Sequence, residues 1–363
     1  MGEYSLADDV LFIGHSLVGT EIPEMLADAV RARGGTGKVT FQVINGAPLV
    51  WNWEHSAEAQ GVDARAELPK GETEVVVLTE AIPLVNHITW SDTDRYAFDF
   101  YRLAVEGNPR ARVFMYETWH DLGSGTGADI PHDDGDDVPW RTRLDQDLPR
   151  WQGIVDAVNA HRPAGAAPMG LIPAGQAFAR LADEIGRGRV PGVDDISAFF
   201  ADGIHPNDLG DYFVTMVQFA VIYGQSPEGL PRTLRGKWGD PFQAPAPKLA
   251  ARLQQIAWEV AAPYAARRAE APVAEAMLIP ARADTLASRP APAAEVAPAQ
   301  GLASPSLAMG LNGISDWSTE HPFLDLMKSA RAWTGHLPGQ WGGWSDADLR
   351  KAGYLDADGW LKA

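Results

Sequence analysis

The chain has 363 residues, enough for one large α/β domain with an additional segment or for two domains. Its 30 Lys and Arg residues against 48 Asp and Glu give a net charge of −18, which argues against binding to nucleic-acid phosphates or to an anionic membrane surface. Hydrophobic residues make up 45%, which excludes wholesale disorder, and the lack of cysteine excludes disulfides, thiolate metal sites and cysteine nucleophiles.

Two sequence signals bear on the compartment, and they leave it open. No stretch approaches the ~18 consecutive apolar residues that a membrane span requires. The first residues also lack the basic start and the apolar run of a signal peptide. A secreted or periplasmic protein whose leader has been removed and a cytoplasmic protein are both compatible with this sequence.

The first two-thirds of the chain alternates short apolar runs with longer amphipathic stretches, a pattern typical of βαβ units around a parallel sheet. The apolar runs predict strands at residues 10–13, 39–44, 75–78, 112–116 and 169–172. The amphipathic stretches predict helices at residues 20–33, 92–106, 141–160 and 207–223. We therefore predict, for residues 1–268, a three-layer α/β/α sandwich with a mainly parallel five-stranded sheet.

The composition changes near residue 269. Residues 269–308 contain 14 Ala and 6 Pro, a proline density that neither a helix nor a central strand tolerates. We predict an extended linker at 269–309. Residues 310–363 carry five of the thirteen tryptophans, and so short a segment is marginal for independent folding. We interpret it as a Trp-rich segment that resembles the opening of an accessory module.

A serine stands where the first predicted strand meets the first predicted helix, in the run Gly14-His15-Ser16-Leu17. Ligands of open α/β sheets bind at the carboxyl edge of the strands, and amides at a helix start can face developing negative charge. Ser16 is therefore a candidate nucleophile. Ser16 as a simple helix cap is an equally good interpretation of this short motif alone.

A second polar run, Asp202-Gly-Ile-His205-Pro206, precedes the last predicted helix. A spacing of three in a tight loop lets the carboxylate reach Nδ1 of the imidazole, which leaves Nε2 free to accept a proton from a serine. Pro206 favours a rigid helix start. The alternative is a turn-forming aspartate beside a histidine of the first helical turn.

Together these two runs resemble the first and last sequence blocks of the SGNH, or GDSL-like, hydrolases, and the similarity covers about residues 8–230. The resemblance implies a flavodoxin-like sandwich with Ser16 as nucleophile, His205 as general base and Asp202 as its orienting partner. It also implies an oxyanion hole built from the Ser16 amide, the amide of a glycine after the second strand, and an asparagine side chain after the third. Gly46 matches the glycine, although an ordinary turn glycine is the alternative.

The asparagine block is where this sequence departs from the family. The family has Gly-x-Asn-Asp after the third strand, whereas this chain reads Thr79-Glu80-Ala-Ile-Pro83. Asn86 lies a few residues later and is the candidate for the third donor, with Asn45 as the weaker alternative. A carboxylate donates only when protonated, so we assign Glu80 to fixing a loop or to meeting substrate hydroxyls. Because the loss of one oxyanion donor costs ~10²–10³ in rate, this departure puts catalytic strength and reaction type in question.

Aromatic and acidic residues follow two of the predicted strands. Trp51 comes after Gly46, and Glu117 and Trp119 come after the fourth strand, so we predict that these residues and Glu80 contact substrate. Aromatic faces stack on pyranose rings, and carboxylates accept hydrogen bonds from sugar hydroxyls. Packing of the tryptophans in the core or in a lid is the competing interpretation. His120 is an alternative base, with Asp121 as its nearest carboxylate in sequence.

The remaining polar runs predict no metal or nucleotide site. The acidic run at residues 132–137 lacks the ligand spacing of a calcium loop, and the nine histidines show no zinc-binding spacing. We predict a serine esterase without cofactor that removes short acyl groups, acetyl above all, from an acylated small molecule or polysaccharide through an acyl-enzyme. The alternatives are an O-acyltransferase with the same triad and a non-catalytic glycan-binding protein. The oligomeric state is open.

Overall fold

The computed structural model describes residues 4–131 and 133–270, and side chains as far as residue 265. All helices and strands of this part lie in one compact unit, residues 1–128 and 137–276. The second unit comprises 129–136 and 277–363, and its described part is an acidic turn in which the Ile130 amide donates to Asp136. The predicted Trp-rich segment, and the linker apart from its first two residues, lie outside the described residues.

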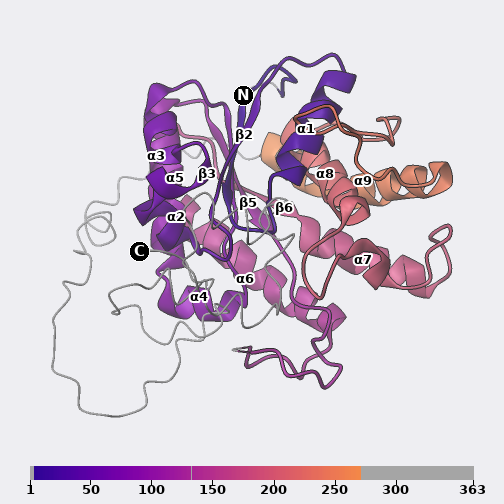
Figure 1. Cartoon of the computed structure of the whole chain (residues 1–363). Coiled ribbons are helices and arrows are strands. Elements are labelled where there is room, and N and C mark those ends of the chain that lie inside the picture. The colour runs from indigo at the N-terminus through magenta and orange to yellow at the C-terminus, as the bar shows by residue number, and fades with distance from the viewer. Residues whose placement is uncertain (1–3, 132, 271–363) are drawn as a thin grey trace, which may run out of the picture. The chain divides into compact units, whose positions relative to one another are not determined.

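A six-stranded sheet forms the centre of the described unit, in the order β3-β2-β1-β4-β5-β6 (Figure 1). All neighbouring strands are parallel except the β2–β3 pair. The strands are β1 (Val10–Gly14), β2 (Val39–Val43), β3 (Gln60–Gly61), β4 (Val75–Leu78), β5 (Arg112–Glu117) and β6 (Gly170–Pro173). The mainly parallel α/β class is thus confirmed. The five predicted strands are all present, and the two-residue β3 adds an antiparallel edge.

Nine α-helices and three short 3₁₀ turns accompany the sheet in the described residues. The α-helices are α1 (Glu21–Ala32), α2 (Leu49–Glu54), α3 (Ala64–Glu67), α4 (Leu84–Trp90), α5 (Thr93–Gly107), α6 (Trp140–Ala160), α7 (Ala174–Gly186), α8 (Asp208–Tyr223) and α9 (Pro247–Glu270). The 3₁₀ turns are η1 (Ser56–Glu58), η2 (Leu68–Lys70) and η3 (Ile196–Phe199). No helix among the described residues is long and apolar enough to cross a membrane.

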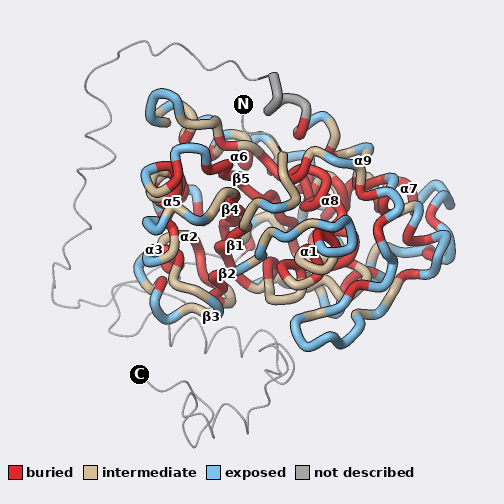
Figure 2. Tube along the Cα trace, turned by 90° about the horizontal axis from the view of Figure 1, so that it is seen from above, coloured by how far each residue is buried: buried red, intermediate tan, exposed pale blue. Residues whose placement is uncertain are grey.

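Alternate residues of the strands point to opposite faces of the sheet, and each face has its own core. Val10 and Phe12 of β1 pack with α1, α7, α8 and α9, whereas Leu11 and Ile13 pack with α2, α3, α5 and most of α6. Both faces are covered, which explains why the strands are continuous apolar runs (Figure 2). The result is a three-layer α/β/α sandwich.

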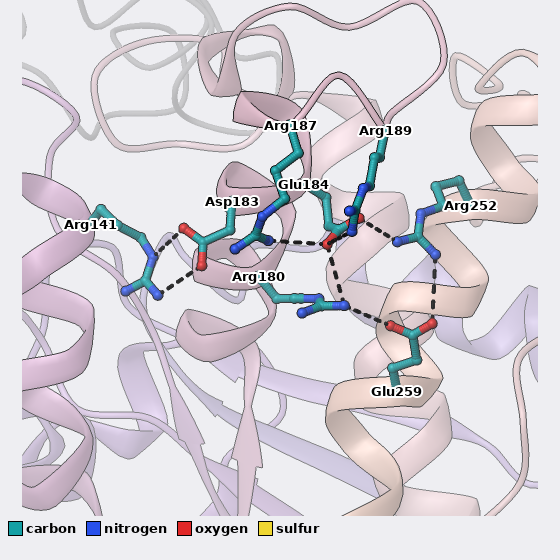
Figure 3. Close-up of polar contacts among 8 residues, drawn as sticks. All are labelled: Arg141, Arg180, Asp183, Glu184, Arg187, Arg189, Arg252 and Glu259. Carbon is teal, nitrogen blue, oxygen red and sulfur yellow. Dashed lines mark hydrogen bonds and ion pairs between the residues drawn. The ribbon is translucent and has the colours of Figure 1, made fainter.

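Buried charge joins two helices on one of these faces. Glu184 of α7 is fully buried, and its carboxylate forms an ion pair with Arg252 of α9 at 2.8 Å. The same carboxylate also forms ion pairs with three arginines close to it in the sequence, Arg180, Arg187 and Arg189 (Figure 3). Glu259 of α9 reaches back to Arg180 at 3.4 Å. Ion pairs with several arginines offset the free-energy cost of removing this carboxylate from water. The cluster therefore holds α9 against α7.

The order of the five parallel strands places one topological switch point in the sheet. The chain moves from β1 to β2 on one side and then to β4 on the other, so connections leave the sheet in opposite directions beside β1. Ligands of open α/β sheets bind outside the carboxyl ends of the strands at such a point. The segments that follow β1, β2 and β4 are therefore where a ligand site is expected.

Candidate active site

Ser16 lies two residues beyond the carboxyl end of β1, in a tight turn before α1. The Val18 and Gly19 amides donate to the His15 carbonyl at 2.8 and 3.1 Å, and Gly19 adopts a φ of 55° that suits glycine. Gly14 ends the strand without a side chain, because a Cβ there would lie 2.5 Å from Thr79 Cγ2. The turn leaves the Ser16 side chain half-buried rather than packed in the core.

Ser16, His205 and Asp202 are brought together by the fold, although the aspartate lies 186 positions after the serine in the sequence. The distance from Ser16 Oγ to His205 Nε2 is 3.0 Å, and that from His205 Nδ1 to Asp202 Oδ2 is 2.9 Å. Asp202 Oδ1 also accepts the amides of Ile204 and His205 at 2.8 and 2.7 Å. An acceptor for the Nδ1 proton leaves Nε2 with its lone pair toward the serine hydroxyl.

The electrostatics of Asp202 favour the ionised form. Partial burial works against the charge, but the hydrogen bond and the positive charge of His205, with the two backbone amides, lower the pKa of Asp202 to about 2. The side chains of His205 and Asp202 are 24% and 36% exposed, so the pair remains open to solvent. An anionic carboxylate at this position can stabilise an imidazolium on His205.

The loop that carries His205 is held by the loop after β5. Trp119 Nε1 donates to the Ile204 carbonyl at 2.8 Å, and the Leu122 amide donates to the Gly203 carbonyl at 2.7 Å. On its other side the loop leads into α8, whose start is capped by Asn207 with bonds to the Leu209 and Gly210 amides. The histidine therefore stands between two fixed anchors.

The backbone amides of Ser16 and of Gly46 have no acceptor among the described residues. Gly46 lies in the turn after β2, which pairs with β1, and its φ of 71° is in the left-handed region that glycine favours. The register pairs Gly14 with Val43, so both turns leave the same edge of the sheet. Asn86, the predicted third donor, is a half-buried residue of α4.

The four residues predicted to contact substrate are all buried. Trp51 is 5% exposed in α2 and stacks on His55, with ring centroids 3.7 Å apart. Glu117, at 1%, accepts the Gln176 side-chain amide at 2.9 Å. Trp119, at 0%, packs against Phe178 and holds the loop of His205. Packing in the core, the competing interpretation, describes the positions of Trp51 and Trp119, and the contact of these residues with substrate stays a prediction.

Glu80, predicted either to fix a loop or to contact substrate hydroxyls, is bound within the protein interior. It is fully buried, and its carboxylate accepts the Leu49 and Ala81 amides at 3.0 and 2.7 Å and the Thr93 hydroxyl at 2.8 Å. Burial raises its pKa to about 7, although the three hydrogen bonds oppose that shift. Glu80 fixes loops in the protein interior.

A second imidazole–carboxylate pair was not apparent from the sequence. His120 Nε2 lies 2.6 Å from Asp147 Oδ2, and Asp147 also bonds Arg150. His120 is 3% exposed, and its Nδ1 has no partner within the described chain. The carboxylate partner is thus Asp147 of α6, 27 residues away, rather than the adjacent Asp121. Within residues 4–131 and 133–270 no group of three or more acidic, histidine or cysteine side chains is arranged to hold a metal ion.

The sequence also gave no role to the side chain of His15. Its Nδ1 accepts the Leu17 amide at 3.3 Å and its Nε2 donates to the Glu80 carbonyl at 3.1 Å. Its place beside the candidate nucleophile was the only signal available, and the partner Glu80 lies 65 positions along the chain.

No family model and no curated protein matches the chain. Among solved structures it is similar to a DUF4886 family protein from Bacteroides uniformis, with a TM-score of 0.51 at 16% identity over 70% of this chain and 94% of the other. That likeness shows the fold alone.

Two further solved structures are more distant. One is described as a GDSL-like lipase from Parabacteroides merdae, with a TM-score of 0.42 at 13% identity over 61% of this chain and 99% of the other. The other is a two-domain esterase active on acetylated mannans, with a TM-score of 0.36 at 14% identity over 64% of this chain and 56% of the other.

Proposed function

We propose that the protein is a serine esterase that hydrolyses short acyl esters, with acetyl esters of carbohydrates as the substrate class. One observation carries the proposal: the hydrogen-bonded line from Ser16 Oγ through both nitrogens of His205 to Asp202, at 3.0 and 2.9 Å. Nucleophile, base and orienting acid in such a line are the parts that acyl transfer through a serine requires.

In the proposed acylation, Ser16 Oγ attacks the acyl carbonyl carbon while His205 Nε2 accepts the hydroxyl proton. Asp202, ionised at neutral pH, stabilises the resulting imidazolium. The negative charge on the carbonyl oxygen faces the amides of Ser16 and Gly46, with Asn86 as a third donor. Collapse of the tetrahedral intermediate breaks the bond to the alcohol oxygen, which takes the proton from His205.

In the proposed deacylation, water takes the position of the alcohol. His205 Nε2 accepts a proton from the water as its oxygen attacks the acyl carbon, and the same proton returns to Ser16 Oγ as the ester bond breaks. The products are the free acid and the regenerated serine. The protein residues supply every proton transfer, so the scheme uses no cofactor.

The carbohydrate part of the proposal rests on Trp90, a surface tryptophan. Trp90 ends α4, the helix that follows the carboxyl end of β4, and it is 64% exposed. An exposed indole offers a face on which a pyranose ring can stack. Trp90→Ala is expected to raise KM for an acetylated polysaccharide and to leave KM for p-nitrophenyl acetate unchanged.

The proposal is tested with p-nitrophenyl acetate and an acetylated polysaccharide, each offered to the wild-type protein and to Ser16→Ala. Release of acetate by the wild type, with loss of at least ~10³-fold in kcat for Ser16→Ala, supports the esterase. Transfer of acetyl to an added sugar acceptor instead of water supports the acyltransferase. Retained polysaccharide binding with no turnover in the wild type contradicts both and supports a glycan-binding protein.

A further inference from the structure

His15 connects the turn of Ser16 to the neighbouring strand. Its ring uses both nitrogens: Nδ1 accepts the Leu17 amide at 3.3 Å, and Nε2 donates to the Glu80 carbonyl at 3.1 Å. The two bonds require a neutral ring with its proton on Nε2. Burial lowers the pKa of His15 to about 4; the Glu80 carbonyl opposes that shift and the charge of His205 adds to it. The ring therefore stays neutral when His205 takes a proton.

Glu80 continues this connection to the turn of Gly46. Its Oε1 accepts the amide of Leu49, the first residue of α2, at 3.0 Å, and only two residues separate Leu49 from Gly46. The same oxygen accepts the Ala81 amide at 2.7 Å, and Oε2 accepts the hydroxyl of Thr93, the first residue of α5, at 2.8 Å. The carboxylate thus ties three segments together at the switch point of the sheet.

We propose that His15 and Glu80 are positioning residues that fix the turn of Ser16 relative to the turn of Gly46. The inference rests on the proposed esterase function, since these turns carry the two amides assigned to the oxyanion. Neither side chain touches the reacting atoms: His15 acts through the Ser16 turn and Glu80 acts through the start of α2. Because a displacement of about 1 Å costs up to ~10²-fold in rate, the separation of the two turns matters for catalysis.

Two substitutions of His15 isolate its bond to Glu80. In His15→Asn the amide oxygen takes the place of Nδ1 and still accepts the Leu17 amide, but the side chain is too short to reach the Glu80 carbonyl. In His15→Gln the amide nitrogen takes the place of Nε2 and keeps the bond to Glu80. We expect kcat for p-nitrophenyl acetate to fall about 10- to 100-fold in His15→Asn and less than about threefold in His15→Gln.

A matched pair of substitutions tests Glu80. Glu80→Gln keeps Oε1 for the two amides and places an amide nitrogen against the Thr93 hydroxyl, which can accept as well as donate. We expect a change of less than about threefold in kcat. Glu80→Ala removes all three bonds, and we expect a fall of about 10- to 100-fold. Should Glu80→Ala fail to fold, Thr93→Val removes one bond and is expected to give a smaller fall in the same direction.

A role in positioning predicts which constants change. A boronic acid that forms a tetrahedral adduct on Ser16 should bind at least tenfold more weakly to His15→Asn, while KM stays within about twofold. His161→Ala is the control, because it also removes a bond from an imidazole to a backbone carbonyl, that of Ala157, and it should leave kcat unchanged. An unchanged kcat in His15→Asn, or a raised KM with the same kcat, overturns the inference.

Amide hydrogen exchange separates this inference from the proposed function, since it needs no turnover. His15→Asn should speed exchange of the Val18 and Gly19 amides, and Glu80→Ala should speed exchange of the Leu49 and Ala81 amides. If the wild type shows no turnover that depends on Ser16, the esterase proposal fails while faster exchange still supports the positioning role. Unchanged exchange in both variants overturns the positioning role, whatever the activity.

Discussion

Two imidazole–carboxylate pairs in this protein have similar distances and different surroundings. His205 and Asp202 are partly exposed, and the free nitrogen of the ring meets a serine hydroxyl at 3.0 Å. His120 and Asp147 are buried, and Arg150 shares the carboxylate. The comparison teaches that a short imidazole–carboxylate distance does not identify a base. Solvent access and a hydroxyl on the second nitrogen are what separate the two pairs.

The largest effect is expected when the two histidines are replaced in parallel. His205→Gln removes the proposed base and should lower kcat for p-nitrophenyl acetate by ~10³–10⁴-fold. His120→Gln should leave kcat within about threefold of the wild type and lower the free energy of unfolding by about 1–3 kcal/mol, because a buried hydrogen bond is disturbed. Kinetics and urea unfolding measure the two quantities. Similar losses of kcat in both variants would contradict a difference in catalytic role between the two pairs.

A second test compares the two carboxylates. Asp202→Asn places an amide group against His205 Nδ1 and favours the wrong tautomer, so we expect kcat to fall ~10²–10⁴-fold with little change in KM. Asp147→Asn leaves Arg150 without its charged partner. It should lower the free energy of unfolding and leave kcat unchanged. Steady-state kinetics and chemical unfolding of both variants provide the measurement. A kcat for Asp202→Asn equal to that of the wild type contradicts the assigned role of Asp202.

The pH dependence of the unfolding free energy tests the protonation of a buried carboxyl group, that of Glu117. Burial raises the pKa of Glu117 to about 8, against the hydrogen bonds from Gln176 and with a contribution from the charge of Asp147. The folded state then binds more protons than the unfolded state between about pH 4.5 and 8, so the unfolding free energy should fall as pH rises through this range. Urea unfolding at intervals of one pH unit measures the slope.

Glu117→Gln supplies the matched variant for that measurement. Because glutamine does not titrate, the fall in unfolding free energy between pH 5 and pH 8 should be smaller than in the wild type, by on the order of 2–5 kcal/mol. Glu80 and Asp211, whose pKa values are also raised by burial, leave a residual slope. Parallel curves for the variant and the wild type would show that Glu117 is ionised in the folded protein.

The smallest effect is expected at Trp119, which joins the two regions. The residue precedes His120 and donates to the carbonyl of Ile204, next to His205. Trp119→Phe keeps most of the packing and loses only this bond, so kcat should fall about three- to tenfold and the unfolding free energy by about 1 kcal/mol. Kinetics with p-nitrophenyl acetate and thermal unfolding measure both. An unchanged kcat would show that the bond from the Leu122 amide to the Gly203 carbonyl and the start of α8 are sufficient to hold the loop.

Local patterns in the sequence were sufficient for the fold class. The buried strands are apolar runs bounded by turn residues, and β1, β4 and β5 lie within one residue of the predicted ranges. The strand β3 was not predicted, because two residues carry no periodicity and Gln60–Gly61 becomes a strand only by pairing with β2. α9 was also missed, although its residues pack against α7 and α8.

The site was predictable only in part, for a physical reason. The distance between Ser16 and His205 depends on sheet order, which the strand pattern of an α/β sandwich restricts to few arrangements. The strand pattern does not restrict the direction in which a single side chain points beyond a strand end. Trp119 turns into the core and Glu80 turns toward the start of α2, and their roles in substrate contact could not be decided from residue type.

The edges of the sheet have a consequence for behaviour in concentrated solution. Within the described part of the chain, one edge is the two-residue β3, and the other, β6, ends at Pro173, which lacks an amide to offer a neighbour. Strands with so few open amides and carbonyls are poor templates for edge-to-edge pairing between molecules. Aggregation by extension of the folded sheet is therefore disfavoured. During expression we expect aggregation to start from partly unfolded chains, in which the internal strands are exposed.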